Sequence, residues 1–345
     1  MNEQSKKWRR IYIELTDRCN MRCSFCPRSK AEGTGDDMPL PHFKALIDDI
    51  AANIPYSIVY LHYLGEPLLY PRLPEALAYC AEHGVRAGLT TNGLLLQQCS
   101  AALAASTLDQ INVSYQGGTE TFMNERLPEV SAGAYLRAVS AGISEVREKG
   151  FKGTVKLKLM TTGPASYFSG SKYSNIETPE AFSLAVRGVY SSLMGRPMTG
   201  DQARLVAGVD CSSHYMYVLA DKLIVETCPF TNWGNWEQGA WPAFFGVCDG
   251  IDGQMVVRRD GTLLPCCNDI GARLNLGNCF EQPLSALLAS GETKVLMKKL
   301  RSGRMPSQVC RKCKGDLSFW TSMKRQAFAL ANIQESGSVT KRIVL

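Results

Sequence analysis

The chain has 345 residues, of which 45% are hydrophobic and 20% are charged, and its formal net charge is +6. These fractions are those of an ordinary globular protein, and they exclude a disordered chain, a collagen-like chain and a coiled coil. No stretch approaches the ~18 apolar residues of a membrane span, and the polar N-terminus shows no secretory signal, so we expect a cytoplasmic protein of about two domains.

Strand and helix patterns alternate through the first half of the chain. Alternating apolar residues predict strands, and apolar residues spaced three and four apart predict helices. The predicted elements, in chain order, are strand 11–15, helix 39–52, strand 57–64, helix 73–83, strand 85–90, helix 94–105, strand 110–114, helix 132–149, strand 154–161 and helix 180–193. Such alternation is typical of right-handed βαβ units that form a parallel sheet.

The length of this alternating region limits the fold. Residues 11–227 leave room for five or six units, whereas a closed eight-unit barrel usually needs ~250 residues. We therefore predict an α/β fold, a partial (β/α)6 TIM-like barrel, over residues 1–227, and a smaller C-terminal extension over 228–345. Ligands of parallel sheets gather at the carboxyl ends of the strands, and a group of cysteines directly follows the first predicted strand.

Thirteen cysteines stand out in a chain without a secretory signal. In a reducing compartment they indicate metal sites or reactive thiols before disulfides. They are concentrated at residues 19–26 and in the last hundred residues, and the region from 251 onward also has fifteen Lys and Arg against seven Asp and Glu. This excess of positive charge could bind a nucleic acid or an acidic substrate. We interpret it instead as basic side chains that form a solvated face and balance the negative charge of the thiolates.

The first cysteine group has the spacing C-x3-C-x2-C, formed by Cys19, Cys23 and Cys26. Three thiolates from one loop can bind three corners of a four-iron cluster and leave one iron open. A structural zinc site normally needs a fourth protein ligand, and no further Cys or His lies close in sequence. The segment resembles the signature of the radical S-adenosylmethionine superfamily, including the aromatic residue Phe25 before the last cysteine.

This resemblance implies a set of cofactors and a reaction. The three cysteines would bind a [4Fe-4S] cluster whose open iron chelates S-adenosylmethionine. Reduction by an external electron donor, such as a flavodoxin or a ferredoxin, then yields a 5′-deoxyadenosyl radical that abstracts a hydrogen atom from the substrate. The cofactor supplies the difficult chemistry, and the protein supplies binding and the exclusion of side reactions.

Other segments resemble the family's cofactor-binding segments. Leu64-Gly65-Glu66-Pro67 follows the second strand and is similar to a Gly-Gly-Glu motif, which implies that Gly65 and Glu66 bind the cofactor's ammonium group. Asn92, within Thr90-Thr91-Asn92-Gly93 after the third strand, would line the site. An exposed turn is the structural alternative for each of these segments.

A further pair is implied on the fourth strand. Ser114 ends this strand, and Arg126 follows twelve residues later. Related enzymes use such a pair on the cofactor's carboxylate, for which Arg is well suited. The family's adenine-contacting glycine motif is not evident in this sequence, so no adenine site is assigned.

The C-terminal cysteines resemble a SPASM or twitch extension. Cys266 and Cys267 precede an amphipathic helix predicted at about 283–300, and Cys310-Arg-Lys-Cys313 follows it. The resemblance implies one auxiliary [4Fe-4S] cluster, because no cysteine follows Cys313. Its expected ligands are Cys248, Cys266, Cys310 and Cys313, with Cys267 as the alternative to Cys266. A four-cysteine zinc knuckle has compatible spacing.

Several residues stay open between structural and functional roles. Cys80 and Cys99 lie in helical patterns and are expected in the core. His62 stands at a strand end, where it would contact substrate or serve the structure. The candidates for a hydrogen-atom donor are Cys211 and Cys228. The aromatic residues that would either cover the barrel mouth or pack in the core are Trp233, Trp236 and Trp241.

The resemblance therefore implies a radical S-adenosylmethionine enzyme, and we expect it to oxidise or epimerise a small, polar substrate in a biosynthetic pathway. The cysteine motif begins within twenty residues of the start, so we expect no leader-peptide recognition domain before it. A peptide-modifying enzyme of the same superfamily is the first alternative. A zinc-dependent nucleic-acid-binding module is the second, although we expect neither a nucleic acid nor a membrane as partner.

Overall fold

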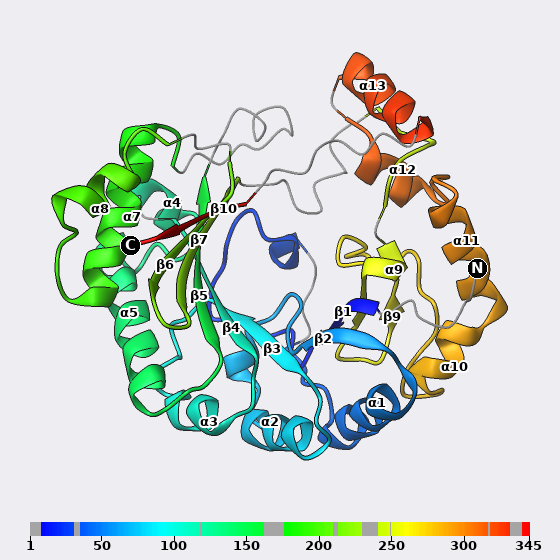
Figure 1. Ribbon diagram of the computed structural model, residues 1–345. Helices are drawn as coiled ribbons and strands as arrows, with labels where there is room; N and C mark the ends of the chain where they lie inside the picture. Colours follow the sequence, from blue (N-terminus) through cyan, green and yellow to red (C-terminus); the bar gives the residue numbers. More distant parts are fainter. Residues whose placement is uncertain are drawn as a thin grey trace. The chain divides into compact units, whose positions relative to one another are not determined.

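The structure is a computed structural model, and it describes residues 8–30, 35–117, 119–161, 176–209, 213–229, 241–248, 250–316, 318–331 and 340–345 (Figure 1). The chain folds into two compact units that are interleaved along the sequence. The first unit comprises Met1–Arg18, Lys30–Ala87 and Trp233–Gly337, and the second comprises Cys19–Ser29, Gly88–Asn232 and Ser338–Leu345. No helix in the described part of the chain is long and apolar enough to cross a membrane.

The first unit is built around strand β1 (Trp8–Ile13). This strand pairs in parallel with β2 (Tyr56–Tyr60) on one side and with β8 (Gln254–Val257) on the other. A short strand, β9 (Leu263–Leu264), extends β8 in the antiparallel sense. The C-terminal region therefore contributes a strand directly beside the N-terminal strand of the chain.

Helices of the first unit come from both ends of its sequence. The early ones are α1 (Leu40–Asn53) and α2 (Leu73–Glu82), and a 3₁₀ turn, η3 (Pro67–Leu69), lies between them. The late ones are α9 (Gly250–Gly253), α10 (Leu284–Ala289), α11 (Gly291–Arg301), α12 (Gln308–Lys314) and α13 (Phe319–Leu330). Helix α1 buries Phe43, Leu46, Ile47 and Ile50, one apolar stripe of the kind that a core-facing helix presents.

The second unit contains a longer sheet in the order β3-β4-β5-β7-β6-β10. Strands β3 (Ala87–Thr91), β4 (Gln110–Gln116), β5 (Thr154–Thr161) and β7 (Leu223–Pro229) are mutually parallel. Strand β6 (Tyr215–Ala220) pairs antiparallel with β7, and β10 (Lys341–Val344) pairs parallel with β6. The helices between these strands are α3 (Ser100–Ala105), α4 (Glu120–Asn124), α5 (Ala132–Glu148), α7 (Pro179–Met194) and α8 (Gly200–Leu205).

Side-chain caps fix the starts of the helices in this unit. Ser131 accepts a hydrogen bond from the Ala134 amide at the start of α5, and Thr178 does the same for the Ala181 amide at α7. The alternation of strands and helices and the parallel pairing confirm the predicted α/β fold class with its mostly parallel sheet. The predicted domain boundary after residue 227 stays a prediction.

Two predicted helices differ from the observed ones. The helix predicted at 94–105 begins only at Ser100, because residues 94–99 form turns after Gly93. The helix predicted at 283–300 is divided into α10 and α11 at Ser290, whose hydroxyl accepts a hydrogen bond from the Thr293 amide at 3.2 Å and starts a new helix. A Ser followed by Gly291 favours this break, because Ser and Gly both have low propensity for the interior of a helix.

Candidate iron–sulfur and cofactor sites

The first cysteine group lies on a loop of the second unit, and the backbone after α4 holds this loop. The amide of Arg22 donates to the carbonyl of Arg126 at 3.1 Å, and the amide of Ser24 donates to the carbonyl of Glu125 at 2.8 Å. The ring of Phe25 stacks on that of Phe122 in α4, with centroids 5.5 Å apart. All three cysteines of the loop are half-buried. The loop is therefore fixed along its length by one short segment.

Arg126 is the buried cation of this region, with 2% of its surface exposed. Its guanidinium donates to the carbonyl of Ser114 at 2.9 Å and to the carbonyl of Tyr115. Burial lowers the pKa of Arg126, but the Tyr135 hydroxyl and the Cys23 thiol beside it more than offset this effect, so the pKa is raised overall. The cation is thus held charged next to a cysteine of the loop.

One donor of this guanidinium is left over. The Nε atom of Arg126 is buried and has no hydrogen-bond partner among the described residues. A buried N–H without a partner is costly, and an anionic ligand would satisfy it. The surroundings of Arg126 therefore fit the cofactor carboxylate that the resemblance implies for Ser114 and Arg126. The hydroxyl of Ser114 itself donates to the carbonyl of Thr91 at 3.0 Å.

Asn92 also lies against the cysteine loop. Its amide nitrogen donates to the side-chain oxygen of Asn20 at 2.7 Å, and its own side-chain oxygen accepts from the amide of Leu94 at 3.0 Å. The following residue, Gly93, has φ +86°, and a β-carbon there would lie 2.9 Å from a methyl group of Val113. The turn thus requires glycine, and it aims the Asn92 side chain at the loop.

Gly65 and Glu66 belong to the first unit, where they lie against the residues that directly precede Cys19. A β-carbon on Gly65 would come within 2.0 Å of the carbonyl oxygen of Thr16, so no other residue fits this approach. The amide of Glu66 donates to the carbonyl of Arg18 at 2.7 Å. The Glu66 side chain is buried, and it accepts a hydrogen bond from the Leu68 amide at 3.1 Å. A buried carboxylate at this position can receive an ammonium group.

A second buried carboxylate, Glu14, was not singled out in the sequence. It follows β1 and accepts hydrogen bonds from the amides of Leu64 at 3.3 Å and Arg259 at 3.4 Å. The Arg258 guanidinium lies 3.9 Å away. Burial raises the pKa of Glu14 to about 7, although Arg258 opposes this effect. The sequence did contain a signal for this buried carboxylate, because Glu14 directly follows the apolar run Ile11–Ile13. Such a run is buried in a parallel strand, so the residue after it is close to the core.

The strands of the second unit carry polar side chains on one face. In β5, Val155, Leu157 and Leu159 are buried, whereas Lys156 and Lys158 between them are half-buried. The register places Thr90, Asn112 and Lys156 in one row across β3, β4 and β5. Lys158 is level with Glu226 on β7. Parallel sheets usually bury apolar side chains on both faces, so this polar face is suited to binding a polar ligand.

The corresponding strands of the first unit carry an aromatic group. Tyr12 stacks on Tyr60 with ring centroids 5.3 Å apart, and His62 meets both rings edge-on at 5.5 Å and 5.4 Å. Burial, in part offset by Arg10, raises the pKa of Tyr12 to about 12. His62 therefore belongs to a packed aromatic group, and whether it also contacts substrate stays a prediction.

The C-terminal cysteines gather within the first unit. Cys248 precedes α9, Cys266 follows β9, and Cys310 and Cys313 lie three residues apart on α12. Burial raises the pKa of the thiols of Cys266, Cys310 and Cys313, and the charge of neighbouring thiolates raises each of them further. Cys248 is among the neighbours that act on all three.

Such a group of thiols is suited to binding the iron ions of an iron–sulfur cluster. Buried thiolates that raise one another's pKa are stabilised by metal ions, which bind the deprotonated form. The amide of Gly250 lies 3.3 Å from the Cys248 sulfur, and the side-chain nitrogen of Asn268 lies 3.7 Å from that of Cys313. In the described parts of the chain, no three His, Cys, Asp or Glu side chains meet in the geometry of a single metal ion.

Cys267 has different surroundings from Cys266. Its sulfur lies 3.4 Å from the side-chain oxygen of Gln254, and its side chain packs against Tyr63, Val256 and Leu264. The hydroxyl of Tyr63 also donates to the Cys267 carbonyl at 3.0 Å. The side chain of Cys267 therefore packs into the small core beside β8.

The remaining candidates are distributed over the structure. Cys80 is buried in α2, as predicted, and burial raises its pKa to about 12. Cys99 precedes α3 and is half-buried. Trp241 is exposed and meets the Phe319 ring edge-on at 5.2 Å. The residues Cys211, Trp233 and Trp236, and the side chain of Cys228, lie outside the described part of the structure.

Comparisons with known proteins agree with these two cysteine groups. Residues 13–164 match the radical SAM superfamily, and residues 248–314 match the SPASM iron–sulfur cluster-binding domain. Fe-coproporphyrin III synthase of Methanosarcina barkeri is 34% identical over 144 residues, which are 41% of this chain and 35% of that protein. GTP 3′,8-cyclase of Mycobacterium ulcerans is 40% identical over 111 residues, 30% of each chain. The matched segments thus span about a third of these relatives.

Solved structures share the fold. SuiB of Streptococcus suis bound to S-adenosylmethionine superposes with a TM-score of 0.55 at 16% identity, over 83% of this chain and 66% of that chain. BtrN in complex with AdoMet and 2-DOIA superposes with a TM-score of 0.50 at 17% identity, over 88% and 92%. These likenesses confirm an α/β fold consistent with a partial TIM-like barrel and a C-terminal cluster domain.

The two matched domains also account for the cofactors. A radical SAM domain implies a [4Fe-4S] cluster and S-adenosylmethionine, and a SPASM domain implies an auxiliary iron–sulfur cluster, which favours iron over a zinc knuckle in the C-terminal region. The chain therefore contains a radical SAM domain, matched over residues 13–164, and a C-terminal SPASM iron–sulfur cluster-binding domain, matched over residues 248–314.

Proposed function

We propose that this radical S-adenosylmethionine enzyme abstracts a hydrogen atom from a small, polar substrate and leads it to oxidation or epimerisation. When bound, the cluster and S-adenosylmethionine supply the chemistry of reductive cleavage and of a 5′-deoxyadenosyl radical. The residues of the chain bind and orient these groups. Cys19, Cys23 and Cys26 would hold the cluster, and the packing of Phe25 on Phe122 would keep their loop in place.

The residues around S-adenosylmethionine have separate tasks in this proposal. Glu66 receives the ammonium group, and Gly65 permits the close approach of its loop to Thr16. The buried guanidinium of Arg126, with its free Nε–H, receives the carboxylate beside Ser114. Asn92 orients the cysteine loop through its hydrogen bond to Asn20. Charged hydrogen bonds of this kind contribute about 1.5–3 kcal/mol each.

The polar face of the second unit is the observation that carries the substrate class. It includes β4, the strand of Ser114, and it presents Lys156 level with Asn112 and Lys158 level with Glu226. Half-buried charged side chains on a sheet face cost free energy unless they pair with one another or with a charged or polar ligand. A substrate with several hydroxyl or amino groups would satisfy both signs of charge.

The auxiliary ligands follow from the C-terminal group. We assign Cys248, Cys266, Cys310 and Cys313 as ligands of one auxiliary [4Fe-4S] cluster, because the charges of these thiols act on one another. Cys267 is excluded from the set in this proposal by its packing against Tyr63. A fully ligated cluster can carry an electron, so the set favours oxidation as the net reaction.

A peptide substrate is the alternative within the same superfamily. SuiB has been solved with its precursor peptide, and BtrN with the small molecule 2-DOIA. Because both likenesses are of the fold alone, they favour neither class of substrate. The preference for a small, polar molecule rests on Lys156, Lys158 and Glu226.

The test uses anaerobically reconstituted protein with dithionite as the electron donor. Deuterated sugars and aminocyclitols are compared with deuterated ribosomal peptides, and mass spectrometry measures deuterium in the 5′-deoxyadenosine formed. We expect transfer from a polyhydroxylated compound, and its loss in Lys158→Met but not in the exposed control Lys152→Met. Transfer from peptides alone would replace the proposed substrate class.

A further inference from the structure

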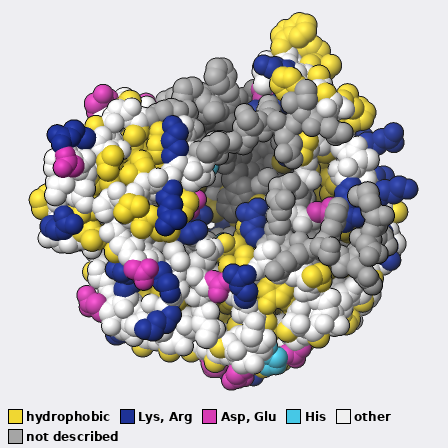
Figure 2. All heavy atoms as spheres, viewed as in Figure 1, with side chains coloured by type: hydrophobic (Ala, Val, Ile, Leu, Met, Phe, Trp, Pro, Cys, Tyr) yellow, Lys and Arg dark blue, Asp and Glu magenta, His cyan; other side chains and the backbone are white. Residues whose placement is uncertain are grey.

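Exposed aromatic and apolar side chains gather near the auxiliary ligand Cys248. Figure 2 shows hydrophobic side chains collected over α13, at the top of the view. In this helix Trp320 is 79% exposed and Leu330 is 62% exposed. The segment before Cys248 adds Phe244 and Val247, which are 53% and 48% exposed. Large exposed apolar patches are uncommon on soluble proteins, and where they occur they usually mark an interaction surface.

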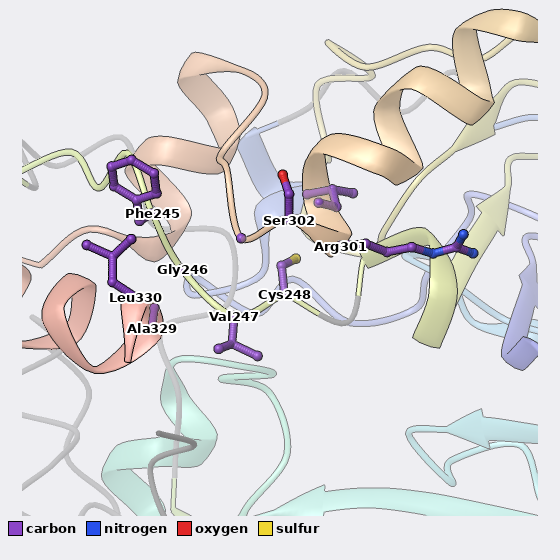
Figure 3. Close-up of a pocket in the computed structure, with 10 residues that line it drawn as sticks. Phe245, Gly246, Val247, Cys248, Arg301, Ser302, Ala329 and Leu330 are labelled. Atoms are coloured by element: carbon purple, nitrogen blue, oxygen red, sulfur yellow. The ribbon is translucent and has the colours of Figure 1, made fainter. Parts of the chain in front are cut away.

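A pocket connects this surface to the Cys248 thiol. Its volume is about 670 Å³, and α11, α13 and the segment before Cys248 all contribute to its lining. Figure 3 shows Cys248 between Val247 and Ser302, with Leu330 of α13 on the same pocket. The backbone fixes this arrangement, because the Gly246 amide donates to the Gly303 carbonyl at 2.9 Å. The proposed auxiliary ligand is thus reached from this surface.

The surface around the pocket is strongly basic. Residues 291–331, which include α11, α12 and α13, contain ten Lys and Arg and two acidic residues, Glu292 and Asp316. Asp316 is buried and paired with Arg325 at 2.8 Å, so it contributes little negative charge to the surface. The exposed cations on these helices and on the turn after α11 include Lys298, Lys299, Arg304 and Lys324. A face with this excess attracts an acidic partner.

We propose that this face, formed by residues 241–248 and by the exposed sides of α11 and α13, docks an acidic one-electron carrier protein of the flavodoxin or ferredoxin kind. The inference rests on the proposed function, because it takes Cys248 as a ligand of the auxiliary cluster. Three observations select this occupant: exposed aromatic anchors, a basic rim, and a pocket that reaches a cluster ligand. Carrier complexes are typically small and weak, which suits a surface of this kind.

The aromatic and basic residues have different tasks in the complex. Trp320 supplies apolar contact area, which concentrates binding free energy at the centre of an interface. Lys324 lies 5.5 Å above the Phe328 ring of the same helix and provides charge beside these anchors. The charge raises the association rate and makes binding sensitive to ionic strength.

The experiment measures complex formation by the intact reconstituted protein, with an oxidised acidic flavodoxin as the probe. Isothermal titration calorimetry gives the dissociation constant at about 20 mM and 300 mM salt. We expect binding that weakens on the order of tenfold at the higher salt. Trp320→Ala and Lys324→Glu should each weaken it about tenfold at low salt.

Two matched controls lie on α7 of the second unit. Leu184 is 73% exposed, and Arg187 is also exposed, so Leu184→Ala and Arg187→Glu repeat the same kinds of change elsewhere. They should leave the dissociation constant unchanged. Absence of binding, equal effects of both pairs, or a Trp320-dependent dimer of the chain itself would overturn the proposal.

The outcome separates this proposal from the proposed function. The readout is binding, and it does not require cleavage of S-adenosylmethionine. A protein that binds the flavodoxin through Trp320 but forms no 5′-deoxyadenosine would contradict the proposed function alone. A protein that forms 5′-deoxyadenosine with dithionite but does not bind the flavodoxin would contradict the docking face alone.

Discussion

The guanidinium of Arg126 donates to the backbone carbonyl of Ser114 at 2.9 Å. Strand β4 and the segment after α4 are therefore joined by a buried cation, which also lies beside the Cys23 thiol. The same side chain thus contacts both the carboxyl end of β4 and the cysteine loop. Its replacement should affect both stability and cofactor binding.

Arg126→Lys should lower the free energy of unfolding by about 1–3 kcal/mol, because lysine cannot serve the carbonyls of both Ser114 and Tyr115 in this geometry. Urea unfolding of the apo-protein measures the change. The control is Arg22→Lys, whose side chain is 73% exposed and pairs with Glu129 at the surface, and it should change stability by less than about 0.5 kcal/mol. Equal effects of the two substitutions would show that Arg126 has no special role in the fold.

Glu66→Gln should weaken the binding of S-adenosylmethionine about tenfold to a hundredfold. The amide oxygen of Gln can still accept from the Leu68 amide, so the loop keeps its shape while the charge that meets the ammonium group is lost. Equilibrium dialysis with labelled cofactor measures the dissociation constant. Glu75→Gln, an exposed change on α2, is the control and should leave it unaltered. An unchanged constant in Glu66→Gln would remove this residue from the site.

Cys266→Ala and Cys267→Ala should differ in iron content. The intact protein should hold about eight irons, from two four-iron clusters. Loss of Cys266 removes a ligand and should leave about four, whereas Cys267 packs beside Val256 and its replacement should leave about eight. Iron and sulfide analysis after anaerobic reconstitution makes the comparison. If Cys267→Ala loses iron and Cys266→Ala does not, the two assignments are reversed.

Glu14 should make stability depend on pH. Its pKa is about 7 in the folded protein, above its ordinary value of 4.5, because burial disfavours the charged form. A raised carboxyl pKa means that the folded state binds more protons, so stability falls as pH rises from 4.5 through 7 and levels off above that. The loss is on the order of 3 kcal/mol across this range.

The comparison variant for this measurement is Glu14→Gln, which cannot titrate. Unfolding free energies at several pH values between 4.5 and 8 should show the wild-type protein losing stability relative to the variant as pH rises. The exposed change Glu82→Gln on α2 should keep the wild-type slope. Parallel curves for wild type and Glu14→Gln would mean that the pKa of Glu14 is the same in the folded and the unfolded protein.

Local patterns predicted much of the fold. Strand β5 has the predicted bounds, 154–161, because its alternation of Val155, Leu157 and Leu159 with lysines reflects one buried and one half-buried face. The apolar stripe of α1 was likewise evident from residue spacing alone. Such elements were predictable because their burial repeats with the period of their own secondary structure.

Other features depend on contacts between distant segments. The pairing of β8 with β1 joins residues about 240 positions apart, and no local pattern encodes it. The packing of Cys267 against Tyr63, Val256 and Leu264 joins segments that are far apart in the sequence. The buried state of Glu14 depends on amides contributed by Leu64 and Arg259. The cysteine motifs revealed the chemistry because their ligand spacing is local in sequence, whereas these supporting contacts are not.

The central claim is that the loop with Cys19, Cys23 and Cys26 holds the cluster at which S-adenosylmethionine is cleaved. The most direct measurement is 5′-deoxyadenosine formation by the triple variant Cys19→Ala, Cys23→Ala, Cys26→Ala, with dithionite, beside the wild-type protein. The account predicts no 5′-deoxyadenosine from the variant, together with about four remaining irons in the auxiliary cluster. Formation of 5′-deoxyadenosine by the triple variant at the wild-type rate would contradict it.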